Sequence, residues 1–374
     1  MSGPSISDRI GGLPRSGIRG IMELALELED VVRLEIGDPD FATPAHIGDA
    51  AAEAARAGFT HYSPGVGLRS LRELIAEKVQ GRNGLVCTPD EVAVTTGACG
   101  GLFSTFLALL DPGDEVLVPD PGWTTVVPMA LAAGVTPVPY RLDRTADFAL
   151  DPGAVDRALR EGRPNIVFFA RPNNPTGTMW PSSLVADVAR AHPDVLVVSD
   201  EAYAAYAGDG MADAVAALPN LLVMRTLSKI GLAALRIGYL RASRGIIAEV
   251  EKIRPPYNLG ALNQRAAVWL LRNHRALLDG MCADVVRERD RLSTTLAAMP
   301  GVRAFSSQAN LILFRVGSPG DGRATAVWQR LCATGVLVRC FDRPGLLSGC
   351  LRVTVGTPTE NDRFLAALKD ALQN

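Results

Sequence analysis

Lys229 is the residue whose setting most clearly suggests chemistry. It follows the apolar run Leu221–Thr226, in a chain that has four lysines among its 38 basic residues and uses arginine for the rest. Unlike arginine, a desolvated lysine can lose its proton, and its free amine can then attack a carbonyl carbon to form a Schiff base. Lys78, Lys252 and Lys369 fall on predicted helical faces, where solvated charges are expected. We therefore predict that Lys229 is a nucleophilic amine.

A carboxylate stands at the end of another apolar run. Val195–Ser199 leads directly into Asp200, and Tyr203 follows three residues later. An ionised carboxylate at the tip of a buried strand is costly to desolvate unless it meets a cation or a hydrogen-bond donor. A protonated heterocyclic nitrogen is one such partner. Capping of a following helix explains this fragment equally well when it is taken alone.

Small residues follow the run Val92–Thr96. Gly97, Ala98 and Cys99 precede an apolar helical stretch over Leu102–Leu110. Backbone amides at the start of that helix would face any anionic group nearby, and a phosphate fits there. An ordinary turn between a strand and a helix also requires small residues, so the motif alone does not decide between the two interpretations.

A rigid turn follows the run Ile166–Ala170. Residues 171–177 (RPNNPTG) contain two prolines and a glycine, which fix the positions of the Asn173 and Asn174 amides. These amides can hydrogen-bond a ligand, and a polar turn that binds no ligand explains the motif as well.

These motifs lie at the ends of strand-like runs that alternate with helix-length segments. Between about residues 90 and 240 the runs are Val92–Thr96, Val116–Pro119, Ile166–Ala170, Val195–Ser199, Leu221–Thr226 and Ile237–Leu240. Such alternation predicts an α/β fold with a mostly parallel central sheet flanked by helices on both faces. Ligands on these sheets bind beyond the carboxyl ends of the strands, which is where the motifs stand.

A smaller α+β domain is predicted after the sheet. Helical patterns over residues 262–300 lead to the strand-like pieces Ala309–Arg315, Gly335–Arg339 and Cys350–Val355 and then to a last helix. In that helix Thr359 and Asp362 are spaced like a capping box. We expect a large domain over residues 45–260 and a small domain formed by residues 1–44 and 261–374. A short helix is predicted over Gly17–Leu28.

Composition narrows the classes of partner. The formal net charge is −2 at pH 7 with no block of like charge, which argues against a nucleic-acid or membrane-surface partner. Six scattered cysteines suggest neither a metal site nor a disulfide scaffold. No run approaches the roughly 18 apolar residues of a membrane span, and no signal-peptide pattern opens the chain. We expect a cytoplasmic protein that binds small molecules and no metal.

Taken in order, the motifs resemble one family. GAC at 97–99, PGW at 121–123, NNPTG at 173–177, DEAY at 200–203 and SK at 228–229 are similar to the class I/II aminotransferases of the fold type I pyridoxal-phosphate enzymes. GDPDFATP at 37–44 and HYSPG at 61–65 resemble the aspartate-aminotransferase-like members. The second half is more similar to histidinol-phosphate aminotransferases, through RTLSKIGLAALRIG at 225–238, PPYN at 255–258 and SGCLRVTVG at 348–356. The resemblance covers nearly the whole chain.

The resemblance implies pyridoxal 5'-phosphate as cofactor and gives several residues a role. Lys229 would hold the cofactor as a Schiff base and shuttle a proton between substrate and cofactor. Asp200 would keep the pyridine nitrogen protonated, which makes the ring an electron sink. Tyr203 and Asn174 would hydrogen-bond the phenolic oxygen, and Trp123 would stack on the ring. The phosphate would be held by Ala98, Cys99, Ser228, Arg236 and, from the neighbouring subunit of a homodimer, Tyr62.

The same resemblance implies the substrate-binding residues. Arg352 would take the α-carboxylate as a two-pronged pair, with Gly37 and Asn174 beside the substrate. Arg339 stands where histidinol-phosphate aminotransferases receive the substrate phosphate, and a solvated arginine explains that position equally well. The chain departs from those enzymes because it has no tyrosine before Tyr62, and no serine or threonine directly beside the cysteine of the GAC motif.

Transamination of an L-amino acid, or of a histidinol-phosphate-like amine, with a 2-oxo acid such as 2-oxoglutarate is the expected reaction. The same scaffold supports decarboxylation, elimination, cyclisation or oxidation in specialised biosynthesis, and this alternative stays open. A non-catalytic sensor is disfavoured, because the N-terminal segment is too short and too weakly basic for a DNA-binding segment. A nicotinamide dehydrogenase is disfavoured because no strand-like run is followed by a Gly-x-Gly-x-x-Gly turn.

Overall fold

The computed structural model describes residues 7–13, 21, 25–26, 30–39, 43–83, 87–162 and 164–373. The helix predicted over Gly17–Leu28 lies for the most part outside these residues, as do positions 40–42 of the motif at 37–44. Within the described ranges, no helix is both long enough and apolar enough to cross a membrane.

A seven-stranded sheet forms the centre of the molecule. Its strands, in spatial order, are β2 (Val92–Thr96), β8 (Ile237–Arg241), β7 (Leu221–Thr226), β6 (Leu196–Asp200), β5 (Ile166–Ala170), β3 (Glu115–Asp120) and β4 (Thr136–Arg141). All are parallel except β8, which runs antiparallel to both of its neighbours. The predicted α/β class with a mostly parallel sheet is therefore confirmed.

The edge strand β4 was not among the predicted strands. It contains Pro137 and Pro139, which pair in register with Val116 and Val118 of β3. Proline has no amide proton to donate to a neighbouring strand, so a run with two prolines argues against a central strand. At the edge of the sheet this loss is tolerated, because one side of the strand has no neighbour to bond.

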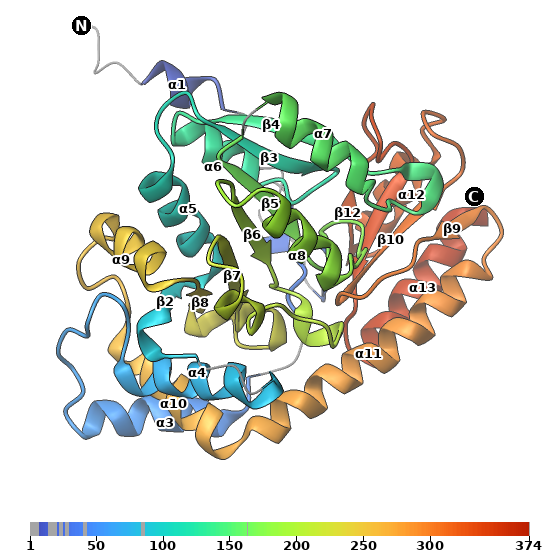
Figure 1. Cartoon of the computed structure of the whole chain (residues 1–374). Helices are drawn as coiled ribbons and strands as arrows, with labels where there is room; N and C mark the ends of the chain where they lie inside the picture. The colour runs from blue at the N-terminus through green and yellow to red at the C-terminus, as the bar shows by residue number, and fades with distance from the viewer. Residues whose placement is uncertain are drawn as a thin grey trace, which may run out of the picture.

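Helices cover both faces of this sheet (Figure 1). One face packs against α4 (Arg69–Asn83), α7 (Pro152–Gly162) and α8 (Ser182–Ala191), and the other against α5 (Gly97–Leu109), α6 (Val126–Ala132) and α9 (Arg244–Ile253). Val197 of β6 lies in the core of the first face, and Val198 lies in the core of the second. Successive residues of a strand thus point to opposite faces. The same rule places the residues at the strand ends.

A second, antiparallel sheet lies beside the large sheet and its helices (Figure 1). Its strands, in spatial order, are β12 (Arg339–Cys340), β13 (Cys350–Thr354), β10 (Leu311–Val316) and β9 (Val302–Ala304). The accompanying helices are α11 (Arg275–Ala297), α12 (Arg323–Ala333) and α13 (Pro358–Gln373). An N-terminal strand, β1 (Val32–Arg33), pairs in parallel with β11 (Val336–Leu337), which joins the first segment to this part of the chain.

The division into two domains remains a proposal, and helix packing bears on its boundary. Helix α10 (Ala261–Asn273) packs on α3 (Ala45–Arg56) and α4, beside the large sheet. The long helix α11 then runs towards the small sheet, where it contacts β9, β10 and α13. These contacts favour a boundary within α11 rather than at residue 260.

The capping box of the last helix, α13 (Pro358–Gln373), lies two residues before the predicted one. The backbone amide and the hydroxyl of Thr357 both donate to the Glu360 carboxylate, at 2.8 Å each, and the Glu360 amide donates to the Thr357 hydroxyl at 3.4 Å. Thr359 and Asp362, the predicted pair, instead lie inside the helix. Pro358 explains the shift, because proline is favoured at the first helical position and leaves the preceding threonine as the cap.

Candidate active site

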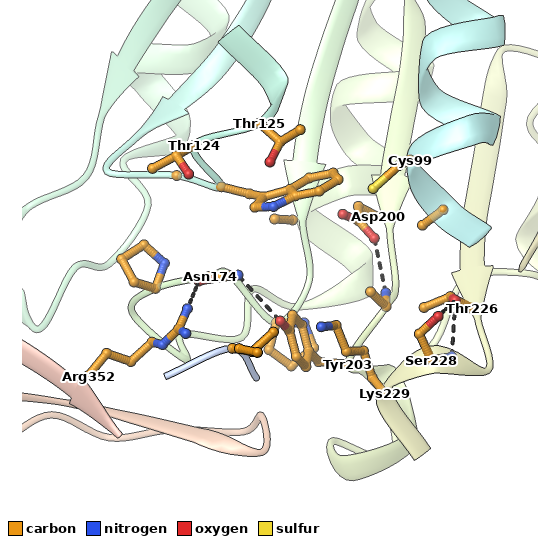
Figure 2. A pocket seen from close by; sticks show the side chains of 18 of the residues that line it. Cys99, Thr124, Thr125, Asn174, Asp200, Tyr203, Thr226, Ser228, Lys229 and Arg352 are labelled. Carbon is orange, nitrogen blue, oxygen red and sulfur yellow. Dashed lines mark hydrogen bonds between the residues drawn. The ribbon is translucent and has the colours of Figure 1, made fainter. Parts of the chain in front are cut away.

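A pocket of about 260 Å³ opens at the carboxyl ends of β5, β6 and β7. It brings together most of the predicted site residues, which come from segments far apart in the sequence (Figure 2). Those that line it are Ala98, Cys99, Trp123, Asn174, Asp200, Tyr203, Ser228, Lys229, Arg236, Arg339 and Arg352. The pocket therefore lies where the α/β topology predicts a ligand site.

Lys229 extends into this pocket from a short turn of 3₁₀ helix, η5 (Ser228–Ile230), that follows β7. Its Nζ lies 5.7 Å from the centre of the Tyr203 ring, and Figure 2 shows the amine directed into the pocket beside that ring. The hydroxyl of Tyr206 donates to the Lys229 carbonyl oxygen, which fixes the turn from below. A primary amine is thus held in a partly desolvated cavity.

Asp200 is the last residue of β6 and is buried, with 6% of its surface exposed. Its Oδ1 accepts a hydrogen bond from the Ala202 amide at 3.0 Å. The pKa of Asp200 is raised to about 7, mainly by burial and also by Glu201, while the Ala202 amide and Lys229 act in the opposite direction. A carboxylate whose charged form is this poorly solvated favours a ligand that brings a cation to it.

Arg352 and Asn174 form a connected chain that ends at Tyr203. Nη1 of Arg352 donates to Oδ1 of Asn174 at 2.8 Å, and Nδ2 of Asn174 donates to the Tyr203 hydroxyl at 3.3 Å (Figure 2). Burial lowers the pKa of Arg352 to about 10, and its Nε has no hydrogen-bond partner among the described residues. A buried guanidinium with a spare donor favours an anionic ligand.

The first turn of α5 forms a cup for an anion together with Arg236 and Ser228. Thr96, the N-cap residue of α5, makes no side-chain cap, so its side chain does not occupy the first amides. A Cβ on Gly97 would lie 2.8 Å from Nη2 of Arg236, and a Cβ on Gly238 would lie 2.6 Å from the Gly97 carbonyl carbon. Both positions require glycine, because β8 and the guanidinium press against the helix start. The cup thus combines a helix N-terminus with a cation and a hydroxyl.

Gly37 and Tyr62 are the two predicted site residues that do not line the pocket of this chain. Gly37 lies close to it, since a Cβ there would be 3.3 Å from the Tyr203 hydroxyl and 3.8 Å from Nζ of Lys229. Tyr62 is 80% exposed and stacks on Tyr257 with ring centres 4.3 Å apart. A contribution of Tyr62 to an active site would therefore require a second subunit.

Arg339 lines the pocket from β12. Its guanidinium carbon lies 5.8 Å from the centre of the Phe341 ring, which also lines the pocket. Burial lowers the pKa of Arg339, and the neighbouring Arg343 lowers it further. The open alternative of a solvated arginine is less favoured, because the guanidinium lines the pocket and has lost part of its hydration.

Sequence reasoning missed several residues of the pocket wall. Ile36, Thr124, Thr125, Thr226 and Phe341 all line it. Thr124 and Thr125 directly follow the predicted Trp123, so their proximity in sequence was a usable signal. Ile36 and Phe341 carry no polar group. The place of Ile36 depends on the pairing of β1 with β11, and that of Phe341 on the pairing of β12 with β13, which local patterns do not reveal.

The donor set fits the cofactor that the motifs lead us to expect. The α5 cup suits a phosphate, Asp200 suits a protonated ring nitrogen, and the amine of Lys229 suits an aldehyde. The unused Nε of Arg352 leaves a further position for a substrate carboxylate. The arrangement can thus hold a phosphorylated, positively charged ring next to an anionic amine donor.

Known proteins resemble this chain over most of its length. A family model for "Aminotransferase class I and II" matches residues 29–368. Histidinol-phosphate aminotransferase 2 of Bordetella parapertussis is 36% identical over 377 residues, which covers 100% of both chains. The histidinol-phosphate aminotransferase of Chromobacterium violaceum is 41% identical over 265 residues, which covers 70% of this chain and 71% of the relative.

Solved structures agree with the sequence matches. A double mutant of the aspartate aminotransferase of Thermus thermophilus superposes with a TM-score of 0.84 at 29% identity, and the match covers 99% of this chain and 100% of that chain. The fold, the pocket and the motifs thus point the same way. The chain belongs to the class I and II aminotransferases, enzymes that depend on pyridoxal phosphate to move an amino group from a donor amine to a 2-oxo acid.

Proposed function

We propose that Lys229 is the residue that links covalently to pyridoxal phosphate and that its amine carries the proton during transamination. The observation that supports this most is the convergence of one amine, one buried carboxylate and one anion cup on a single pocket. Bound pyridoxal phosphate supplies an electron sink for the bond broken at the substrate α-carbon. With the cofactor bound, the Lys229 amine, which lines the pocket, would accept and return the proton of the substrate α-carbon.

The other pocket residues hold the cofactor in this proposal. Asp200 accepts the ring N–H as an ionised carboxylate, and the cation relieves the cost of its burial. Tyr203 and Asn174 donate to the ring oxygen, and the Asn174 amide is oriented by its bond to Arg352. Trp123 covers the ring. The phosphate binds to the amides of Ala98 and Cys99 and to the side chains of Ser228 and Arg236.

For the substrate, we propose an amine donor that carries a distal anion, with histidinol phosphate as the first candidate. Arg339 lines the pocket and is partly desolvated beside Arg343. Relatives that cover the whole chain are named histidinol-phosphate aminotransferases. Arg352 serves the carboxylate of the amino or oxo acid that takes part in the other half of the reaction.

We also propose a homodimer with shared active sites. Exposed apolar side chains gather on α5 and α6, where Phe103, Leu107, Val127 and Leu131 are each 36–43% exposed. Exposed apolar surface of this kind marks a protein–protein contact. Tyr62 is free of its own pocket and 80% exposed, so it can reach a pocket in a second copy.

Replacement of Lys229 by alanine tests the covalent link. We expect the purified wild-type protein to be yellow and to gain the mass of the cofactor on Lys229 after borohydride reduction, because reduction makes the link permanent. Lys229→Ala should lose the yellow colour and the added mass, and its turnover should fall by about a thousandfold or more. Lys252→Ala, which removes an exposed lysine, is the matched control. A cofactor mass still attached to the Lys229→Ala chain would refute the assignment.

Gly238→Ala tests the phosphate cup. The new Cβ would meet the backbone of Gly97 and Ala98, at 2.6 Å and 2.9 Å, so the start of α5 must move. We expect the dissociation constant of pyridoxal phosphate to rise by about tenfold or more, measured by fluorescence titration of cofactor-free protein. Gly245→Ala is the control, since nothing lies within 4 Å of its Cβ position. Equal affinity in both variants would place the phosphate elsewhere.

Arg339→Gln tests the substrate proposal. Removal of the charge should lower kcat/KM for histidinol phosphate by about a hundredfold, since a desolvated charge pair is lost. The value for phenylalanine should change by less than about threefold, because that donor has no distal anion. Arg339→Lys keeps the charge and should fall between the two. An equal loss for both donors, or no turnover of histidinol phosphate by the wild type, would contradict the proposal.

Mixed dimers test the shared site. Dimers made only of Lys229→Ala chains or only of Tyr62→Ala chains should both be impaired. A mixed dimer of the two should have about half of the activity of a wild-type dimer. One of its two sites then combines an intact Lys229 with an intact Tyr62 from the partner. Sedimentation velocity measures the dimer. Leu107→Arg should weaken the dimer, whereas Ala366→Arg, at an exposed position of α13, should not. A monomer, or no complementation, would rule out the shared site.

A further inference from the structure

A buried ion cluster lies directly behind the Asp200 carboxylate, on the opposite face of the sheet. Asp200 points into the pocket (Figure 2), and the next residue, Glu201, points away from it, as strand alternation requires. Two arginines at the ends of the neighbouring strands accompany Glu201: Arg171 after β5 and Arg225 in β7. The side chains of Glu201 and Arg171 are 0% exposed.

Both carboxylate oxygens of Glu201 accept hydrogen bonds. Its Oε2 accepts from Nε and Nη2 of Arg225, at 2.8 Å and 2.6 Å. Its Oε1 accepts from the Met211 amide at 2.6 Å and from Nη1 of Arg171 at 3.5 Å. Arg171 is anchored in turn by the Trp180 carbonyl oxygen, at 2.7 Å. Its Nη2 also pairs with the Asp209 carboxylate at 2.8 Å, closer than its Nη1 lies to Glu201. Charge-assisted bonds of this kind, buried and mutually satisfied, define a single geometry.

Residues of both neighbouring strands fix the peptide group that joins Asp200 to Glu201. The Arg171 amide donates to the Asp200 carbonyl oxygen at 2.7 Å, and the Glu201 amide donates to the Met224 carbonyl oxygen at 2.8 Å. Arg171 and Glu201 therefore contribute both backbone and side-chain bonds around the residue that carries the pocket carboxylate. A site is precise when the groups behind it are locked in this way.

We propose that Glu201, paired closely with Arg225 and more distantly with Arg171, is a positioning residue for Asp200 that sets the orientation and the charge of the cofactor-binding carboxylate. The proposal rests on the role of Asp200 at the cofactor ring. Neither arginine lines the pocket, so both act through Glu201 and not by contact with a ligand.

The charges of the cluster predict the direction in which each of them shifts the pKa of Asp200. The titratable groups that act on Asp200 are the Glu201 carboxylate behind it, and the Lys229 amine and the Cys99 thiol in the pocket. Glu201 raises the pKa of Asp200, and Lys229 lowers it. Burial by itself lowers the pKa of Arg225, but Glu201 raises it well above its usual value, so this guanidinium stays charged. Loss of the Glu201 charge should therefore lower the pKa of Asp200, and loss of the Arg225 charge, which opposes the charge of Glu201, should raise it.

The binding of pyridoxamine phosphate as a function of pH measures this ionisation without turnover. This form of the cofactor carries an amine in place of the aldehyde, so it cannot link to Lys229. Affinity should strengthen as the pH rises through the pKa of Asp200, about 7, because the ionised carboxylate is the form that holds a protonated ring. Calorimetry from about pH 5.5 to 8.5 should show this inflection. Asp200→Asn should remove the inflection, which assigns it.

Two charge variants should move the inflection in opposite directions. Glu201→Gln removes the negative charge and should lower the inflection by about half a pH unit or more, whereas Arg225→Gln should raise it by a similar amount. Arg225→Lys keeps the charge and should stay within about 0.2 pH unit of the wild type. If Arg225→Gln does not fold, the sign of the Glu201→Gln shift decides alone. Shifts of the same sign, or no shift, would overturn the proposal.

A matched control separates positioning from a general loss of stability. Arg241 on β8 is also fully buried and contacts the Glu91 carboxylate at 3.4 Å, but it lies outside the cluster. Arg241→Gln should lower the thermal stability, as the loss of a buried partner does, and leave the inflection unchanged. If the wild type binds no pyridoxamine phosphate, the cofactor site itself is refuted. If it binds with an inflection that no cluster variant moves, the role of the cluster alone is refuted.

Discussion

The cost of burying two charges, on Asp200 and on Arg352, determines how the pocket is arranged. Burial raises the pKa of Asp200 to about 7 and lowers the pKa of Arg352 to about 10, because in each case the charged form loses its hydration. The folded chain thus keeps one carboxylate that favours a bound cation and one guanidinium that favours a bound anion. A ligand that supplies both charges removes both costs at once, so binding also stabilises the fold. Pyridoxal phosphate and an anionic substrate together have this charge pattern.

Strand geometry separates these available charges from charges that are permanently paired. At the end of β6, Asp200 faces the pocket and Glu201 faces the opposite core, one residue apart. Arg171 and Arg225 neutralise Glu201 from the two neighbouring strands. If Asp200 had such partners on its own face, it would have no capacity left for a cofactor. Because side chains alternate along the strand, the ion-paired Glu201 and the pocket carboxylate of Asp200 can be adjacent residues.

Much of the central sheet and of the pocket could be predicted from the sequence, because apolar runs followed by polar motifs are local signals. The strand β4 could not, since Pro137 and Pro139 contradict the usual strand pattern and only its place at the sheet edge permits them. Phe341 was missed for another reason: it reaches the pocket through the packing of the small sheet, and nothing in its own segment indicates a ligand. The ion pair of Glu201 with Arg225 was also missed, because 24 residues separate the partners.

Lysine and arginine have different tasks in this structure, which explains why an arginine-rich chain retains a lysine at position 229. Arg225 must stay protonated while buried against Glu201, and a guanidinium does so at any physiological pH. The pocket requires the reverse, a cationic side chain that gives up its proton to attack a carbonyl carbon and can later take one back. Arginine cannot do this, since its proton is held too tightly. The permanent cations therefore line the pocket to bind anions, as Arg236 and Arg352 do, or pair with Glu201 behind it, and the residue that reacts is the one whose charge can be removed.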